Sequence, residues 1–226
     1  MDALELIQMQ IRLEYRVDAQ GCMATYPGSS EQAYYIVYQH SCGYQPFLSL
    51  ELPVELQQKL LAIGPGVAFE QPEKITKLIS DVRGPCKGGE EIFWSGYFAR
   101  IHAEGDHPLA SRDGEKWVIF RDGQVVSQAM SVREDEHCAE VYVETLPAYR
   151  GRGYGRQVVA AWAWDIMRGG RAAFYSYKMT NSASAALACS LGVVWYANVV
   201  SFEAVRTQKP SRKDRERLDG LVLAGE

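Results

Sequence analysis

The segment at residues 139–168 constrains the fold of this chain more than any other. It opens with AEVYVET (139–145), whose β-branched and aromatic residues predict a strand. It closes with an amphipathic helix predicted over 156–168. The glycine-rich run RGRGYG (150–155) joins the two. This junction is either a turn that changes the chain's direction or a cradle for phosphate. Successive glycines let backbone N–H groups converge, and N–H groups at a helix N-terminus lack intrahelical partners and favour an anion.

Two common nucleotide motifs do not fit this junction. A dinucleotide fold requires GxGxxG, with an acidic residue about twenty positions later. Here Gly151, Gly153 and Gly155 give GxGxG, and Phe174 to Ser176 stand at the later position. The chain contains no Walker A run, GxxxxGK followed by Ser or Thr. The glycine spacing therefore argues against a nucleotide-dependent enzyme.

The second half of the chain predicts an alternation of strands and helices. An Asp-Gly pair between two apolar runs indicates a hairpin, and a glycine follows each predicted helix. The predicted strands are a hairpin at 116–132 that turns at Asp122-Gly123 and three more at 139–145, 171–179 and 193–205. One predicted helix covers 156–168. A second helix, capped by Thr180 or Asn181, runs up to Gly192. The order is β-β-β-α-β-α-β: an antiparallel meander followed by a crossover whose strands should be parallel.

The first half of the chain is harder to interpret. Its periodicity predicts strands at 33–41 and 46–53 and helices at 54–64 and 72–82. The aromatic stretch FWSGYFARIH (93–102) is a further core strand or a wall of a substrate pocket. The glycine-rich run RGPCKGGEE suggests a boundary near residue 90. The predicted units are an N-terminal α/β region at 1–90 of unassigned role, a domain at 91–206, and a polar tail at 207–226.

Composition narrows the class of protein. The net charge of -4 gives no support to general nucleic-acid binding. The five cysteines include no CxxC and the four histidines show no ligand spacing, so we predict neither a disulfide framework nor a metal site. No apolar stretch is long enough to span a membrane, and the acidic N-terminus does not resemble a secretory signal. We expect a cytoplasmic protein with no nucleic-acid or membrane partner.

The stretch from 116 to 203 resembles the GNAT superfamily of acetyl-CoA-dependent N-acetyltransferases. The family's first motif is Arg or Gln, two residues, Gly, one residue, then Gly or Ala; its second is an Asn, a small residue, and a helix that ends at Gly. The matching residues are Arg150, Gly153 and Gly155 in the first motif and Asn181, Ser184 and Gly192 in the second. The resemblance implies an α+β (mixed α/β) fold, in which a mixed sheet combines an antiparallel meander with a β-α-β crossover. Here a smaller α/β N-terminal region precedes it.

The resemblance also implies a cofactor, acetyl-CoA. Backbone N–H groups of RGRGYG would hold its pyrophosphate, the strand that ends at Val143-Glu144-Thr145 would pair with its pantetheine arm, and Asn181 would reach that arm from the other side. The two strands of the crossover would be splayed to receive it. The cofactor-binding residues implied are Val143, Thr145, Arg150, Gly151, Arg152, Gly153, Tyr154, Gly155, Asn181 and Ser184.

Two glutamates are candidates for the base. Glu140 and Glu144 lie four apart on one predicted strand and so share a face. Either could accept the amine's proton, with Glu144 nearer the loop, or both could simply face solvent. Many relatives carry a tyrosine seven residues after the motif asparagine, where this chain has Ala188. The tyrosines on neighbouring strands that could replace it are Tyr175, Tyr177 and Tyr196.

Two functions follow from these features. The first is an N-acetyltransferase that moves an acetyl group from acetyl-CoA to a primary amine of a small molecule or peptide by direct transfer. The second is a non-catalytic acyl-CoA-binding or regulatory module on the same fold, which Ala188 and the unmatched first half favour. A homodimer is left open.

Overall fold

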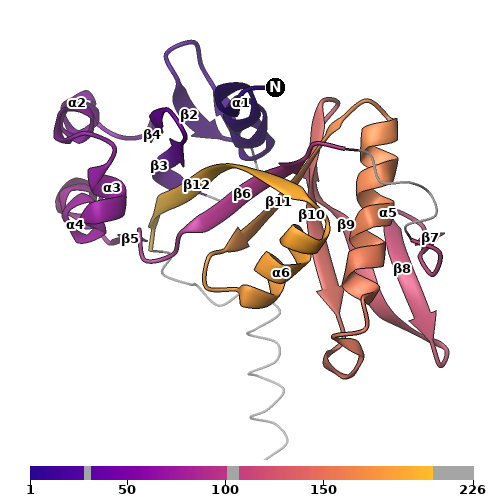
Figure 1. Ribbon diagram of the computed structural model, residues 1–226. Helices are drawn as coiled ribbons and strands as arrows, with labels where there is room; N and C mark the ends of the chain where they lie inside the picture. Colours follow the sequence, from indigo (N-terminus) through magenta and orange to yellow (C-terminus); the bar gives the residue numbers. More distant parts are fainter. Residues whose placement is uncertain (28–31, 101–106, 206–226) are drawn as a thin grey trace, which may run out of the picture.

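The structure is a computed structural model that describes residues 1–27, 32–100 and 107–205. Within these ranges the chain forms one 12-stranded mixed sheet with helices on both faces (Figure 1). The strands are β1 Tyr15–Val17, β2 Cys22–Thr25, β3 Ala33–His40, β4 Gly43–Ser49, β5 Cys86–Gly88, β6 Phe93–Phe98, β7 Ser111–Asp113, β8 Lys116–Arg121, β9 Gln124–Glu134, β10 Cys138–Thr145, β11 Ala172–Lys178 and β12 Val193–Ala204. The helices are α1 Ala3–Glu14, α2 Val54–Ile63, α3 Val67–Glu70, α4 Pro72–Arg83, α5 Tyr154–Arg168, α6 Ser182–Ser190 and the 3-10 turn η2 Pro147–Tyr149. The predicted α+β class is confirmed.

The predicted order of elements in the second half is also confirmed. β8 and β9 form an antiparallel hairpin, and its turn residues Asp122 and Gly123 both have positive φ, 51° and 76°. β10 pairs antiparallel with β9 and parallel with β11, as the crossover requires. α5 begins at Tyr154, two residues earlier than expected and inside RGRGYG.

The pairing between β10 and β11 is short. It joins Cys138–Glu140 to Ala172–Phe174 and ends there. Beyond this point β10 continues to Thr145 against β9, while β11 continues to Lys178 against β6. The sheet is therefore split along its middle, and the split opens toward the ends of both strands.

Strands from both halves of the chain share this sheet. Its order is β1-β2-β4-β3-β12-β6-β11-β10-β9-β8-β7, with β5 on β12. β6, which precedes the meander in sequence, lies between β11 and β12. Of the aromatic stretch at 93–102, residues 93–98 form β6, a core strand as expected, while residues 101 and 102 lie outside the described residues. The boundary near residue 90 stays a prediction, although β5 and β6, on either side of it, belong to one sheet.

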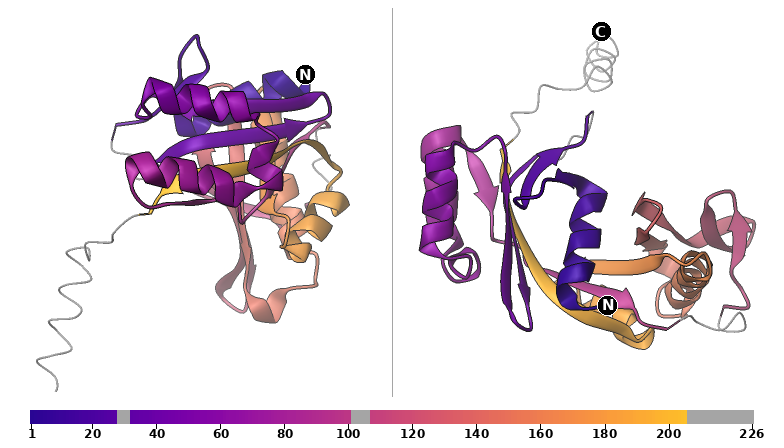
Figure 2. Two further views of the ribbon diagram at one scale, coloured as in Figure 1. Left: turned by 90° about the vertical axis from the view of Figure 1, so that its left-hand side faces the viewer. Right: turned by 90° about the horizontal axis from the view of Figure 1, so that it is seen from above.

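The two faces of the sheet are covered by different helices. α5 packs on one face against β8 to β11, in a core that includes Trp162, Ile119 and Ala173. α2 and α4 cover the same face farther along, over Tyr35 and Phe202. α1 lies on the other face, inside the curve of the sheet (Figure 2).

α1 is the main element that the sequence analysis did not predict. Its buried stripe, Leu6, Ile7, Gln10 and Ile11, has helical spacing. Asp2 and Glu5 form a capping box at its start, and this Asp-x-x-Glu pattern was a usable signal.

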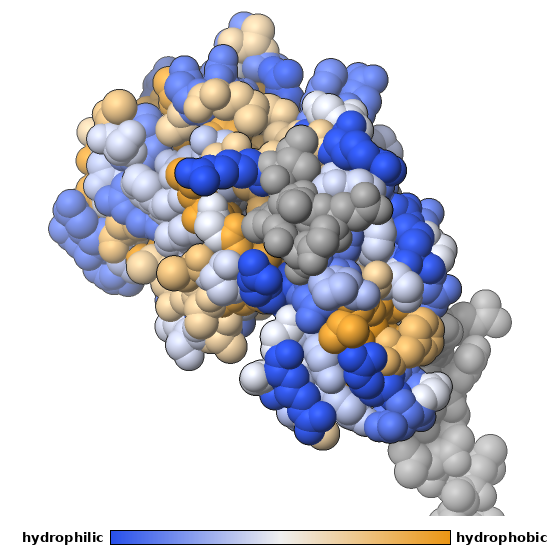
Figure 3. Space-filling model, turned by 45° about the vertical axis from the view of Figure 1, so that its right-hand side comes forward, coloured by the Kyte–Doolittle hydropathy of each residue, from blue (hydrophilic) through white to orange (hydrophobic). Residues whose placement is uncertain are grey.

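On the face shown in Figure 3, hydrophobic residues gather in several separate areas between hydrophilic ones. Among the described helices, none is long and apolar enough to cross a membrane. The predicted tail at 207–226 lies outside the described residues.

Candidate active site

The split between β10 and β11 opens into a cavity of about 830 Å³, here called the RGRGYG cavity. β10 supplies one wall, the RGRGYG loop and the start of α5 a second, and α6 a third (Figure 1). Its lining residues are Tyr142, Val143, Glu144, Thr145, Tyr149, Arg150, Gly151, Gly153, Tyr154, Gly155, Arg156, Asn181, Ala183, Ser184, Ala186, Leu187 and Ser190. The structure thus brings together both glycine-motif and asparagine-motif residues around one space.

The glycines of the loop are required by its backbone. Gly151 and Gly153 have φ of 73° and 76°, a left-handed conformation that residues with a Cβ rarely adopt. Gly153 is the N-cap of α5, and no side chain caps the helix there. The first N–H groups of this 15-residue helix therefore stay open toward the cavity, where the helix dipole is positive.

Gly155 has a different role. A Cβ at this position would lie 3.3 Å from Thr145 Oγ1 and 3.7 Å from Leu187 Cδ2. The glycine therefore lets α5, β10 and α6 approach one another where the three elements wall the cavity.

One edge of β10 turns its backbone toward the split. The Leu146 N–H donates to Val126 O at 2.9 Å, and Ser127 Oγ donates to Glu144 O at 3.3 Å, so these residues face β9. Because successive residues of a strand alternate in direction, the N–H and C=O of Val143 and Thr145 point the other way. Arg150 Nε, which donates to Thr145 O at 3.1 Å, agrees with this direction.

α6 presents its N-terminus to the same cavity. Asn181 is its N-cap and accepts from the Ser184 N–H at 3.1 Å. Of the two predicted caps, Asn181 rather than Thr180 performs this role.

The arginines differ from expectation. Arg152 Nη2 donates to Ala148 O at 3.3 Å, its guanidinium lies over the Tyr149 ring, and it does not line the cavity. Arg156 does line it, and its Nε donates to Ser190 O at 3.4 Å. Arg156 directly follows the last glycine of the motif, which was a usable signal that the sequence analysis passed over.

The two candidate glutamates lie in different surroundings. Glu144 is exposed, lines the RGRGYG cavity and accepts from Gln128 Nε2 at 3.1 Å. Glu140 is 6% exposed and accepts from Arg133 Nη1 at 3.2 Å and from Gln10 Nε2 at 3.4 Å. It lines a second cavity of about 400 Å³, called here the α1 cavity because Gln10 and Glu14 of α1 help to form it. The sequence could not show this difference because Gln10 is 130 positions from Glu140.

Neighbouring residues of β10 line the two cavities. Val141 lines the α1 cavity, and its neighbours in sequence, Tyr142 and Val143, line the RGRGYG cavity. The linings of the two cavities are therefore adjacent along β10, next to the point where its pairing with β11 ends.

The three candidate tyrosines also lie in different surroundings. Burial raises the pKa of Tyr175, whose buried hydroxyl forms no hydrogen bond within the described residues. Tyr177 packs against Trp94, with ring centroids 5.0 Å apart. Tyr196 lies on the α1 side, where its hydroxyl donates to Gln10 Oε1. Of the three, Tyr175 is the one in the core that α5 and α6 cover, together with Ala188 and Leu191.

Residues 111–203 match the family model described as GNAT acetyltransferase. This match confirms the resemblance drawn from the two motifs. No match was found among curated proteins.

Solved structures give distant likenesses to the same family. A GCN5-related N-acetyltransferase-like protein from Streptococcus suis is 16% identical, with 75% of this chain and 83% of that one covered at a TM-score of 0.42. A GCN5-related N-acetyltransferase from Kribbella flavida is 14% identical, with 90% and 94% covered and a TM-score of 0.42. An acetyltransferase of the GNAT family from Colwellia psychrerythraea is 12% identical, with 84% and 80% covered and a TM-score of 0.43.

Proposed function

We propose that this protein is an N-acetyltransferase that moves an acetyl group from acetyl-CoA directly to a primary amine. The observation that carries the proposal is the split between β10 and β11, which opens beside a helix N-terminus that no side chain caps. The family match over 111–203 supports the same activity.

The residues around the RGRGYG cavity fit coenzyme A. The N–H groups from Gly151 to Arg156 suit a pyrophosphate, because they are unpaired donors at the positive end of a helix. Arg150 and Arg156 add positive charge to the lining, against one carboxylate, that of Glu144. The outward-facing backbone of Val143 and Thr145 can pair with the amides of an extended pantetheine arm. We propose that Asn181 and Ser184 form the wall opposite the RGRGYG loop. Arg152 does not line the cavity and would act only by stabilising the loop.

Acetyl-CoA supplies an acetyl thioester, and the chain's own groups then favour attack by an amine. A backbone N–H on the free edge of β10 is placed to donate to an oxygen that gains negative charge during transfer. The ammonium must lose a proton before it can attack. Glu140 is our first candidate to accept it, directly or through water, because it lines the α1 cavity at the last residue that β10 pairs with β11. Glu144 remains the alternative.

One observation favours the second candidate function, a module that binds acyl-CoA without turnover. Ala188 is 2% exposed and packs in the core beneath α6, so the position of the usual tyrosine holds only a buried methyl group. Release of the CoA thiol in the presence of an amine distinguishes the two functions, because only the enzyme produces it.

The test uses two variants of one residue. Acetyl-CoA should raise the thermal midpoint of the wild type, since a ligand that binds only the native state stabilises it. Gly153→Asp places a carboxylate at the proposed pyrophosphate site and should remove this rise. Gly153→Asn is the matched control: Asn and Asp are similar in shape and both tolerate positive φ. It should keep a measurable rise. The absence of any rise in folded wild type would refute the proposal.

A further inference from the structure

Gln10 is the one polar residue in the buried stripe of α1, whose other members are Leu6, Ile7 and Ile11. It is 4% exposed. A buried amide without hydrogen bonds would destabilise the fold. The partners of Gln10 come from three strands, β10, β11 and β12, in the part of the chain that the family model matches. Gln10 therefore connects the N-terminal helix to the strands around the split.

The chemistry of its neighbours fixes the orientation of the Gln10 amide. Burial raises the pKa of Tyr196 well above the ordinary value, so its hydroxyl is protonated, and it donates to Gln10 Oε1. The Nε2 group points the other way, where it donates to Ser176 Oγ at 2.9 Å and to Glu140 Oε1 at 3.4 Å. A carboxylate can only accept hydrogen bonds. A reversed amide would place its carbonyl oxygen against this carboxylate, so only one orientation is favourable.

The second oxygen of Glu140 has a different partner. Arg133 Nη1 lies 3.2 Å from Glu140 Oε2 and 3.5 Å from Glu14 Oε1, so two carboxylates share one guanidinium nitrogen. Glu14 and Gln10 are four residues apart on α1 and therefore lie on one face of the helix, and both line the α1 cavity. α1 thus acts on Glu140 in two ways: directly through a hydrogen-bond donor, and through a like charge that competes for Arg133.

The other titratable groups that face Glu140 keep their protons near neutral pH. Tyr38 of β3 and Tyr196 of β12 have a pKa raised well above the ordinary value, first by burial and then by nearby groups that include Glu140. Burial raises the pKa of the Cys138 thiol, on the same strand, to about 12. Glu203, the third glutamate of the cavity lining, stands on β12, three strands away from β10.

We propose that α1 is part of the catalytic machinery, with Gln10 as a positioning residue that holds the carboxylate of Glu140 in place at the α1 cavity. Glu14 has the opposite effect, because its negative charge opposes that of Glu140. This inference rests on the proposed function, since Glu140 is the proton acceptor of the same transfer. It also gives a role to the N-terminal region, to which no sequence motif assigns one.

The test follows the titration of Glu140 itself in the full chain. Carbon-13 labelling of the glutamate carboxyl groups gives a titration curve for each residue in the NMR spectrum, and Glu140→Gln identifies the curve of Glu140 by its absence. Gln10→Met keeps the length of the side chain and removes the donor. It should move the midpoint of Glu140 up by about one pH unit, because a hydrogen bond to the charged form is lost. Glu14→Gln removes a like charge and should move the midpoint down.

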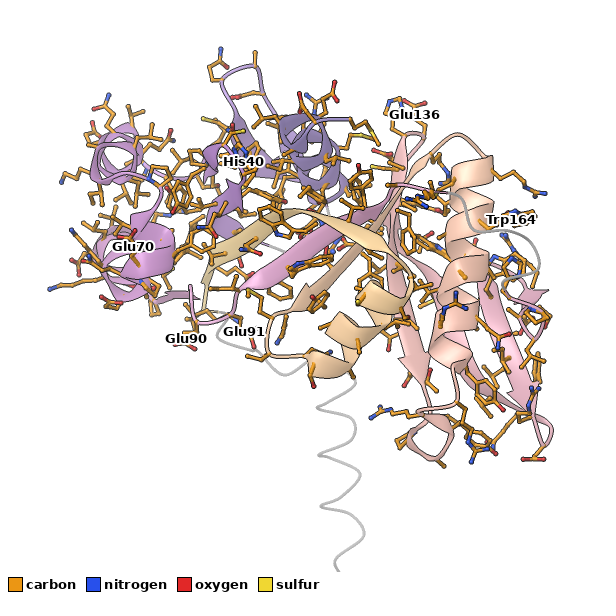
Figure 4. The ribbon with its side chains drawn as sticks, in the orientation of Figure 1. His40, Glu70, Glu90, Glu91, Glu136 and Trp164 are labelled. Atoms are coloured by element: carbon orange, nitrogen blue, oxygen red, sulfur yellow. The ribbon has the colours of Figure 1, made fainter. Side chains whose placement is uncertain are left out.

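Two controls separate positioning from packing and from net charge. Ile7→Val alters the same buried stripe of α1 without removing a polar group, and it should leave the midpoint of Glu140 unchanged. Glu90→Gln changes the net charge as Glu14→Gln does, but in the loop between β5 and β6, away from β10 (Figure 4). It should also leave the midpoint unchanged, because solvent and salt screen a distant exposed charge.

CoA release from acetyl-CoA with a panel of simple primary amines gives the matching kinetic readout. In Gln10→Met, kcat should fall about tenfold on the acidic side of the pH profile, and the loss should shrink as the pH rises, because the carboxylate is then charged in both proteins. The KM for acetyl-CoA should stay unchanged, since Gln10 does not line the RGRGYG cavity.

Three results would overturn the inference: a midpoint of Glu140 that Gln10→Met leaves unchanged, a shift of equal size in Ile7→Val, and an upward shift in Glu14→Gln. If acetyl-CoA raises the thermal midpoint of the wild type in such a case, the proposed function stands and only the role of α1 is wrong. If the midpoint of Glu140 moves as expected but acetyl-CoA gives no thermal rise, the proposed function fails, and with it the catalytic role of these contacts.

Discussion

The two cavities on either side of the split are built in different ways. The RGRGYG cavity takes its lining from two segments of the second half of the chain, within 142–156 and 181–190, and carries two arginines. The α1 cavity draws its lining from Gln10 to Glu203 and carries three glutamates. Two short motifs can specify the first cavity, because each of its two lining segments is local in sequence. The second exists only when the first half of the chain packs against the second.

The largest effect on turnover should come from replacing Glu140. We expect Glu140→Gln to lower kcat about 100-fold or more, because a positioned proton acceptor contributes on this order. Glu144→Gln, the matched control in the other cavity, should lower it less than about tenfold. Steady-state CoA release, with folding checked by thermal unfolding, measures both. A greater loss of kcat in Glu144→Gln would mean that Glu144, in the RGRGYG cavity, accepts the proton instead.

The packing of α1 gives the next prediction. Ile11 is fully buried in the cluster that joins α1 to Phe174 and Tyr196. Ile11→Ala should lower the free energy of unfolding by about 2–5 kcal/mol, as for other large-to-small core substitutions. Urea denaturation measures this. Leu4→Ala, at a site 45% exposed on the same helix, should change it by less than about 0.5 kcal/mol. Similar values for the two variants would show that α1 does not pack as described.

Cys138 of β10 lies against α1, and its titration should make the stability of the fold depend on pH. Its Sγ lies 3.7 Å from Met9 O of α1, and burial raises its pKa from 9.0 to about 12, with Asp135 adding to the shift. The folded state thus holds a proton that the unfolded state loses above pH 9. Stability present below pH 9 should be lost as the pH rises toward 12, by up to about 1.4 kcal/mol per pH unit.

Thermal unfolding of wild type and Cys138→Ala between pH 8 and about 10.5 checks this. The variant should show a shallower decline, because the remaining buried thiol, Cys86, and the tyrosines titrate in both proteins. Parallel curves for the two proteins would contradict the prediction.

The smallest effect concerns the cap of α6. Asn181→Ala should cost about 1 kcal/mol, the usual value for a lost N-cap, and should weaken acetyl-CoA binding through the wall that α6 forms. Thr180→Ala is the control, since the structure assigns no cap to Thr180. Chemical denaturation and calorimetry of both variants measure the two effects, and equal losses would mean that the cap assignment is wrong.

Sequence patterns predicted the second half of the fold well and the first half less completely. The hairpin at Asp122-Gly123 and the helix that follows the glycine loop came from turn chemistry and helical period, which act over a few residues. β5 was not predicted because its three residues, Cys86–Gly88, lie in a glycine-rich run and are a strand only through pairing with β12. The neighbours of β6 were equally hidden, since its partners β11 and β12 lie some 80 to 100 residues away.

The sequence by itself determined the backbone of the RGRGYG loop: Gly151 and Gly153 permit the left-handed conformation, and the helix after them leaves its first N–H groups uncapped by a side chain. These are local properties of the chain, and any fold that keeps the strand and the helix will keep them. Only the tertiary structure decided the surroundings of Glu140, whose partners Gln10 and Arg133 come from α1 and β9. Burial and charge pairing depend on which segments meet, and the sheet brings together residues that no spacing rule relates.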